Sequence, residues 1–416
     1  MLTLDSIRKN AEWSVVITCL RQPSDNAEAD RCRELLHSGV DWEALFEFAN
    51  LHDLLPMLFW GLDRMFAAYV PSATMELLSD HFQANHLRNR LAADVFQTCH
   101  NILRSENIPH IVFKGFALSS TVYEHPALRQ FGDIDLLLHP DHLDRACHLC
   151  EDIGYSRIYP QFMLRNPLIQ QLSPKQLIVY ENYYHEFTLQ SRDELMPLDL
   201  HWRWSPRMYP SDPDLSTVWN EATPLSFGGV SALTLSAEHQ LLNVCIHAAR
   251  DRWKQLKWVV DIDRILRSTG AFDWERLQHF AKASRAERIL RIGIQVAHHL
   301  IETPIPPEAP KYVRKKARQR DLAPVLSALF LPEKQPSRTL RCLGINEVYF
   351  RIHGMSLHQI QYFLQALIMP RPADEVTFNV PWIDQPLWKL YRPVRVVKSC
   401  IRRMHISRNN GETQKD

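Results

Sequence analysis

Apolar residues recur at three- and four-residue spacing through the first hundred positions, as in helices that bury one face. The pattern is clearest in "DWEALFEFANLHDLLPMLFWGL", which begins at Asp41, and in "LAADVFQTCHNILRSE", which begins at Leu91. Asp41 suits the N-cap of the first of these helices. Pro71 and Ser72 separate two of the segments. The spacing therefore predicts an N-terminal helical region over residues 1–105.

The spacing changes after residue 105. A short apolar run, Ile111 to Phe113, lies between Pro109 and Gly115, which predicts a buried strand. The helix "FALSSTVYE" is expected directly after it. "DIDLLL" predicts a second strand, and another helix is expected from about residue 141 to 152.

Two further β-rich runs follow. Strand-forming residues extend from Ile178 to Leu189, and about seven polar residues separate them from "LDLHWRW". This arrangement predicts an antiparallel hairpin. Helical spacing then returns in "SAEHQLLNVCIHAARDRWKQLKWVVDIDRILRS" and continues to about residue 369.

These patterns predict a helix-rich α+β fold. A small mixed sheet over residues 106–230 would form a catalytic core, flanked by helical regions over residues 1–105 and 231–416. The chain has only 12 glycines in 416 residues, which favours helices over an all-β architecture.

The balance of acidic and basic residues argues against a protein drawn to nucleic acid or membranes by its overall charge. Lys and Arg number 48 against 47 Asp and Glu, for a net charge of +1, so no overall field attracts nucleic acid or membrane. No run of about eighteen apolar residues and no signal-peptide core occur. We therefore expect a cytoplasmic protein without a transmembrane segment or a strong nucleic-acid signal.

The eight cysteines are scattered along the chain, which indicates free thiols rather than a disulfide framework. Cys147 and Cys150 alone have a spacing typical of metal ligands, but they fall on one apolar helical stripe. We expect them to be core thiols.

Asp133 and Asp135 in "FGDIDLLL" are the first candidate functional residues. Residues i and i+2 of a strand share a face, so both carboxylates point the same way while Ile134 and Leu136 enter the core. Two such charges repel unless a cation lies between them, and Mg²⁺ prefers oxygen ligands. The alternative is that both are simply exposed on a half-solvated sheet.

A third carboxylate, Asp199, lies in the alternating segment "PLDLHWRW". If this strand lies beside that of Asp133 and Asp135, the three carboxylates can hold two metal ions about 3.5 to 4 Å apart. Upstream, Lys114 and Gly115 join a strand to a helix, where free backbone N–H groups can face a phosphate.

Four segments carry a resemblance to a known family: "FKGFALSSTVYEHPALRQFGDIDLLL", "LDLHWRW", "CIHAARDRWKQLKWVVDIDRIL" and "LWKLYRPVRVV". From about residue 40 to 400, the chain resembles the bacterial "uncharacterised nucleotidyltransferase" family of the DNA polymerase beta-like nucleotidyltransferase superfamily. The resemblance implies that the protein binds Mg²⁺, as two ions, and an NTP such as ATP. It would transfer NMP to a hydroxyl or similar acceptor and release pyrophosphate.

The resemblance also implies roles for individual residues. Asp133 and Asp135 would be metal ligands, and Asp199 would hold the catalytic metal and help to deprotonate the acceptor. Gly115 would be the phosphate-binding glycine of the superfamily. Phe116 follows it where a small hydroxyl residue is typical, so Lys114 and Arg129 are expected to supply the missing phosphate contacts.

Other side chains are weaker candidates. His201 and Arg203 share the polar face of Asp199 and would contact phosphate or acceptor, or else pair with neighbouring carboxylates. His185 would point into the same pocket. His247 and Asp261, by resemblance, would help to bind the base or the acceptor, unless this helix is merely solvated.

Two other functions remain open. The departures around Gly115 favour a catalytically inactive nucleotide-binding or regulatory protein on the same framework. A metal-dependent phosphohydrolase is a third option, because a pair of aspartates can also serve hydrolysis. The acceptor, whether small molecule, sugar, peptide or protein, is undetermined, as is the role of the basic segment "LWKLYRPVRVVKSCIRRMHISR".

Overall fold

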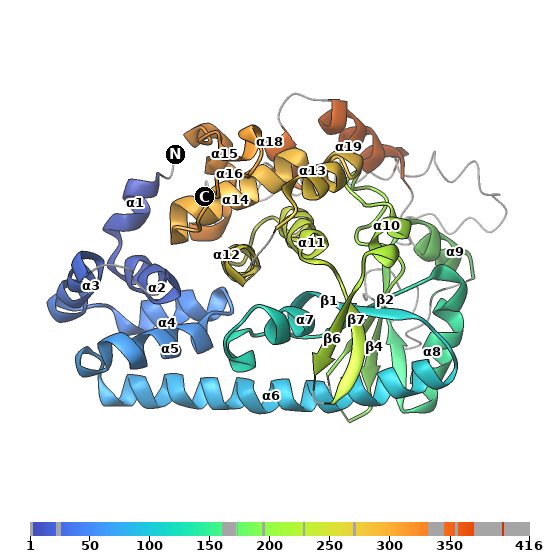
Figure 1. The fold of residues 1–416 in the computed structure, drawn as a ribbon, viewed down its shortest axis with the longest axis horizontal. Helices are drawn as coiled ribbons and strands as arrows, with labels where there is room; N and C mark the ends of the chain where they lie inside the picture. Colours follow the sequence, from blue (N-terminus) through green and yellow to red (C-terminus); the bar gives the residue numbers. More distant parts are fainter. Residues whose placement is uncertain are drawn as a thin grey trace, which may run out of the picture.

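A computed structural model describes residues 3–21, 26–159, 172, 174–193, 196–227, 229–268, 272–331, 345–353, 357–369 and 393–394. These residues form a helix-rich α+β fold in which helices precede and follow a mixed sheet, as predicted (Figure 1). The basic C-terminal segment lies outside the described residues, apart from residues 393–394.

The N-terminal region is helical, as its apolar spacing predicts. The Asp41 side chain accepts a hydrogen bond from the Ala44 backbone N–H at 3.0 Å and so caps α4, while Pro71 immediately precedes α6. Figure 1 shows α6 running beneath both the N-terminal helices and the sheet. The helices are α1 (Leu4–Lys9), α2 (Ala11–Arg21), α3 (Asn26–Ser38), α4 (Trp42–Leu51), α5 (Leu55–Phe66) and α6 (Ser72–Ser105).

The described residues form a seven-stranded sheet in the order β3-β4-β5-β2-β1-β7-β6. The central strands β2 and β5 are parallel, and Asp135 lies directly beside Asp199. β1 is antiparallel to β2 and parallel to β7. The strands are β1 (His110–Phe113), β2 (Ile134–Leu138), β3 (Tyr155–Ile158), β4 (Glu186–Ser191), β5 (Leu198–His201), β6 (Thr223–Phe227) and β7 (Val230–Thr234).

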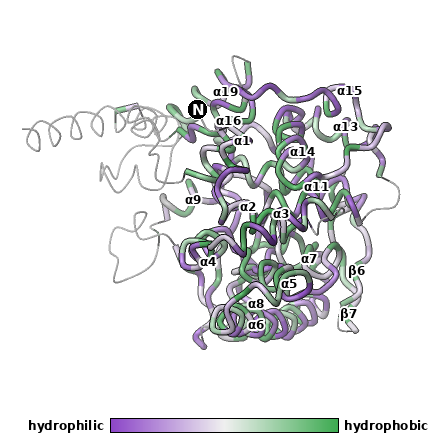
Figure 2. The backbone as a smooth tube through the Cα atoms, turned by 90° about the vertical axis from the view of Figure 1, so that its left-hand side faces the viewer, coloured by the Kyte–Doolittle hydropathy of each residue, from purple (hydrophilic) through white to green (hydrophobic). Residues whose placement is uncertain are grey.

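Alternation along β2 divides its side chains between two layers. Ile134, Leu136 and Leu138 pack in one apolar cluster with residues of α6, whereas Leu137 belongs to the cluster formed mainly by the N- and C-terminal helices. Figure 2 shows hydrophobic and hydrophilic residues alternating along α6, as expected for a helix that buries one side. The helices between the strands are α7 (Lys114–Thr121), α8 (Leu143–Asp152), α9 (Pro174–Tyr183) and α10 (Leu215–Asn220).

The C-terminal region is helical where the structure describes it. In Figure 1, α11 lies above the sheet and α12 lies above α7, both on the side away from α6. The helices are α11 (Ala237–Arg250), α12 (Lys257–Ser268), α13 (Trp274–Ala283), α14 (Glu287–Ile301), α15 (Lys311–Arg314), α16 (Gln319–Phe330), α18 (Glu347–His353) and α19 (Leu357–Ile368). Among the helices that the structure describes, none combines the length and the apolar character needed to cross a membrane.

The strand predicted from Ile178 to Leu189 is wrong in its first half. Residues 174–183 form α9, and the strand begins only at Glu186. The buried ring of Tyr180 stacks on Phe187 with centroids 5.5 Å apart. Packing of this helix against the sheet therefore overrides the weak preference of Ile, Val and Tyr for strands.

The hairpin of β6 and β7 has no counterpart in the prediction, which assigned only helices after the Pro- and Ser-rich segment that follows Trp204. β3 was not predicted either. Two other predictions are confirmed: Cys147 and Cys150 are free, buried thiols of α8, and β4 and β5 are antiparallel neighbours.

Candidate active site

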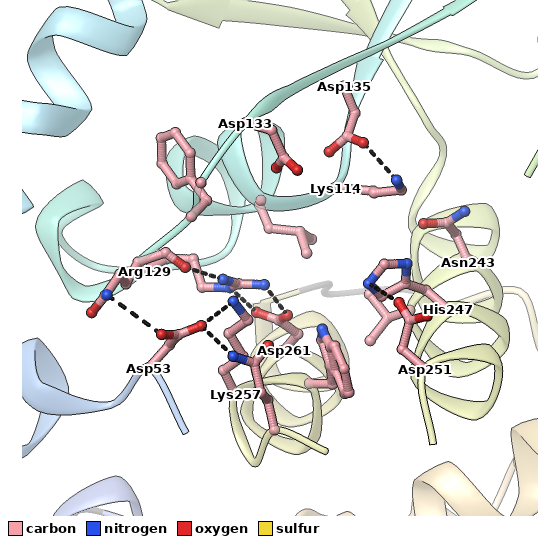
Figure 3. Close-up of a pocket in the computed structure, with 18 of the residues that line it drawn as sticks. Asp53, Lys114, Arg129, Asp133, Asp135, Asn243, His247, Asp251, Lys257 and Asp261 are labelled. Carbon is pink, nitrogen blue, oxygen red and sulfur yellow. Dashed lines mark hydrogen bonds and ion pairs between the residues drawn. The ribbon is translucent and has the colours of Figure 1, made fainter. Parts of the chain in front are cut away.

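The predicted carboxylates meet on one face of the central strands. Asp135 of β2 and Asp199 of β5 are paired in register, and His201 follows two residues later on the same face. One ligand-type atom from each of these three residues lies within 4.8 Å of the others. Asp133 precedes β2, is half-buried and lines the same cavity (Figure 3). The structure thus brings all four residues to one place, with Asp133 at the edge of the group.

These carboxylates lie in a poorly solvated environment. Asp135 and Asp199 are only 2% and 8% exposed. Burial, and then the negative charge of Glu186, raises the pKa of Asp199 well above its usual value. Burial and Asp135 raise the pKa of Asp133 to about 6. Within the described part of the chain, the buried Oδ1 atom of Asp199 has no hydrogen-bond partner. An oxygen-preferring cation such as Mg²⁺ fits this donor set.

Lys114 places a positive charge inside the cluster. Its Nζ atom lies 2.5 Å from Asp135 Oδ1 and 3.2 Å from His201 Nε2. Burial opposes the charged form of Lys114, but Asp135 and Glu186 outweigh it and raise the pKa of Lys114. The lysine therefore stays protonated, and Figure 3 shows its ammonium group beside Asp135.

Gly115 is required by close packing. A Cβ atom on Gly115 would lie 2.5 Å from Phe131 Cβ. The glycine lets the first turn of α7 approach the loop that leads to Asp133. Both residues line the cavity.

A second set of polar residues extends the cluster along β4. Glu186 is paired with His201, and its Oε2 atom lies 3.3 Å from His201 Nδ1 and 3.0 Å from His185 Nε2. The Arg250 guanidinium also contacts His185 Nε2, at 2.5 Å. Burial and then Lys114 lower the pKa of His201 to about 3, so this imidazole is neutral at neutral pH.

Glu186 was missed in the sequence because the strand that carries it was predicted to begin too early. With the strand starting at Glu186, alternation puts Glu186 and Thr188 on the face of Asp199 and His201.

A cavity of about 660 Å³ opens from this cluster. The acidic groups of Asp133, Asp135, Asp199 and Glu186 line it together with Lys114. Figure 3 shows side chains from α11 and α12 completing the wall opposite the strands. The charged residues that line the remainder are Asp53, Arg88, Arg129, Arg250, Asp251, Lys254, Lys257 and Asp261.

Arg129 lines the cavity, but its guanidinium is already engaged. Its Nε and Nη2 atoms each donate to one carboxylate oxygen of Asp261 at 2.7 Å, and Nη1 donates to the Gln130 carbonyl. Tyr123 donates to the same carboxylate at 2.6 Å. The pair is almost fully buried. Arg129 and Asp261 therefore form a structural link between the loop before Asp133 and α12.

The remaining predicted candidates lie in three different surroundings. His247 lines the main cavity and lies 3.3 Å from Asp251. Arg203 does not line the main cavity. Its Nη2 atom lies 2.6 Å from Asp212 Oδ2, which agrees with the alternative that Arg203 forms an ion pair with a neighbouring carboxylate. His185 lines a smaller neighbouring cavity of about 300 Å³ that shares Glu186 and Arg250 with the main one.

Comparisons with known proteins found a matching family model and distantly similar solved structures. A family model described as "Uncharacterised nucleotidyltransferase" matches residues 38–302, more than half of the chain. No curated protein matches the chain.

Two solved structures show distant similarity. One is ANT(2")-Ia in complex with adenylyl-2"-tobramycin, which is 14% identical, covers 46% of this chain and 96% of its own, and has a TM-score of 0.32. The other is an antigenic nucleotidyltransferase-like protein from Paracoccidioides brasiliensis, which is 18% identical, covers 52% of this chain and 93% of its own, and has a TM-score of 0.30.

Proposed function

The chain belongs to the uncharacterised nucleotidyltransferase family, and from this premise we propose that it transfers NMP from an NTP to a hydroxyl or similar acceptor. The reaction would need Mg²⁺ and would release pyrophosphate. One observation carries the proposal: Asp135 and Asp199 lie side by side on parallel strands, buried, with an oxygen of Asp199 that has no partner among the described residues.

Asp135 and Asp199 would hold the metal, with Asp133 at the edge of the same group. Bound Mg²⁺ would withdraw charge from the α-phosphate and orient it for in-line attack. His201 Nε2 and Lys114 Nζ both contact Asp135 Oδ1, at 2.8 and 2.5 Å. These contacts fix the orientation of the Asp135 carboxylate, as outer contacts do at metal sites.

The charged groups that line the cavity suit a nucleoside triphosphate. The carboxylate cluster would lie at the α-phosphate, Lys114 would lie beside it, and Arg88, Lys254 and Lys257 would face the departing pyrophosphate. Lys257 also pairs with Asp53. Arg129 is assigned no phosphate contact, because Asp261 occupies its donors.

Asp199 is positioned to accept the proton of the acceptor. In the transfer, the acceptor oxygen forms a bond to the α-phosphorus, the bond from that phosphorus to the bridging oxygen breaks, and pyrophosphate leaves with the electron pair. The acceptor proton would pass to Asp199 Oδ1.

Label transfer tests the proposal. The protein would be incubated with Mg²⁺, cell extract and each of four α-³²P-labelled NTPs, and acid-stable label would be followed in small-molecule and macromolecular fractions. We expect label to be transferred by the wild type and by Asp80→Asn, a control at an exposed position of α6. Asp135→Asn should transfer none.

Retained transfer by Asp135→Asn would contradict the assignment. Metal-dependent NTP binding without any transfer would instead favour the inactive binding protein. Release of labelled NMP or phosphate alone would favour a phosphohydrolase.

A further inference from the structure

We propose that His185, Glu186 and His201 bind a transition-metal ion of the zinc type, at a site separate from that of Mg²⁺. The proposal concerns a second ion beside the catalytic end and does not depend on nucleotidyl transfer. One ligand-type atom from each of the three residues lies within 4.8 Å of the others.

The spacing of the donor atoms suits direct coordination. His185 Nε2 and His201 Nδ1 lie 3.0 and 3.3 Å from the same carboxylate oxygen, Glu186 Oε2. Zinc bonds of about 2.0 to 2.1 Å at tetrahedral angles place neighbouring ligands roughly 3.3 Å apart. The donors therefore need only small movements to surround an ion.

An unpartnered nitrogen points independently to a cation. His201 is fully buried, and its Nδ1 atom has no hydrogen-bond partner among the described residues. The contact of Nε2 with Asp135 at 2.8 Å, shorter than its 3.2 Å contact with Lys114, places the hydrogen on Nε2. Nδ1 then directs a lone pair at the Glu186 carboxylate, and a cation between them would satisfy both.

The donor set selects the kind of metal. Two imidazoles and one carboxylate suit zinc and related ions, whereas Mg²⁺ prefers oxygen ligands. The ligands come from β4, from the residue just before it, and from β5. A bound ion would therefore hold the two strands together and fix His201, and through His201 the carboxylate of Asp135.

Arg250 would compete with the ion. Its Nη1 atom lies 2.5 Å from His185 Nε2, so the guanidinium and a metal cannot both occupy this position. Asp251, 3.3 Å from Arg250 Nη2, offers the guanidinium another partner. Lys114 adds a second positive charge nearby. Removal of Arg250 should therefore strengthen metal binding.

Zinc binding by the full chain tests the proposal. Chelator-treated protein would be equilibrated with Zn²⁺ in excess Mg²⁺, with bound zinc measured by mass spectrometry and affinity by competition with a chromophoric chelator. We expect His185→Gln to lose one zinc or to bind it at least about tenfold more weakly. His148→Gln, which alters an exposed histidine, should match the wild type. Arg250→Gln should bind zinc more tightly.

Asp199→Asn separates this site from the carboxylate site. It should retain the zinc, because Asp199 is not a ligand of the proposed ion. The proposal is overturned if His185→Gln binds zinc like the wild type, if Asp199→Asn loses the zinc instead, or if neither wild type nor Arg250→Gln binds any. Circular dichroism of each variant would confirm that it is folded. None of these readouts needs transfer activity, so failure of the proposed function would leave the result interpretable.

Discussion

Replacement of Asp199 by Asn should stabilise the metal-free protein and abolish its response to Mg²⁺. Asp199 and Asp135 lie side by side and are almost fully buried. Asparagine keeps the size of the side chain and removes one of the two charges. The variant therefore isolates the repulsion that a metal ion would otherwise relieve.

The size of the effect follows from Coulomb's law. Two unit charges about 5 Å apart repel by roughly 3 kcal/mol at an effective dielectric constant of about 20. Lys114, 2.5 Å from Asp135, offsets part of this repulsion. We expect Asp199→Asn to raise the free energy of unfolding by about 1 to 2 kcal/mol at pH 8 in chelator.

The stability of the wild type relative to Asp199→Asn should fall as pH rises. The pKa of Asp199 is raised in the folded protein, chiefly by burial and then by Glu186, so the folded state binds this proton more tightly than the unfolded state. The wild type therefore loses stability as pH rises above the unfolded pKa of about 4. The advantage of the variant should be largest at pH 8 and disappear near pH 4.

Thermal unfolding at several pH values, with chelator or with Mg²⁺, measures both effects. For a chain of 416 residues, the gain corresponds to a melting temperature about 1 to 3 °C higher in chelator. Mg²⁺ should raise the melting temperature of the wild type alone. A variant that is less stable than the wild type in chelator at pH 8, or that still responds to Mg²⁺, would refute the reasoning.

Three further predictions concern the scaffold. Arg129→Met should lower the free energy of unfolding by about 3 to 5 kcal/mol in urea titrations, because it leaves the buried Asp261 carboxylate without its ion-pair partner; a loss below about 1 kcal/mol would contradict the assigned role. Gly115→Ala should lower the free energy of unfolding by about 1 to 3 kcal/mol, because the added methyl group would contact Phe131. A double-mutant cycle with Phe131→Ala measures this contact, and the cost of Gly115→Ala should be smaller in the Phe131→Ala background. Burial lowers the pKa of His52 to about 4, so protonation of His52 should cost about 3 kcal/mol of stability as pH falls from 6.5 to 4. Urea titrations of His52→Gln should show a pH-dependent loss smaller than that of the wild type by this amount, and an unchanged loss would exclude a contribution from His52.

The sequence predicted the carboxylates well because alternation along short strands is a strong local signal. The two-residue spacing of Asp133 and Asp135 predicts that they share one face of a strand, and Asp199 lies in a segment whose apolar and polar residues also alternate. Their convergence needed one further condition, that β5 lies beside β2, and the register confirms it. The helical regions were likewise predicted, since long amphipathic helices carry their pattern over many residues.

Contacts between distant parts of the chain could not be predicted in the same way. Arg129 was expected to contact phosphate, and nothing in its neighbourhood reveals a partner 132 residues away. Glu186 was overlooked because the helix before it contains strand-forming residues, held in place by stacking between Tyr180 and Phe187. The hairpin of β6 and β7 was missed because both strands expose much of their surface and so lack a clear apolar face.

The cavity walls come from four parts of the chain: the loop around Asp53, α6 with Arg88, the strands with their flanking residues, and the two helices that carry His247 and Asp261. A fragment able to form this cavity must consequently be much longer than the sheet. A shortened chain that ended at residue 230 would keep Asp135 and Asp199 yet lack α11 and α12. Gene fusions or truncations intended to retain activity should therefore extend at least from the residues before Asp53 to those beyond α12.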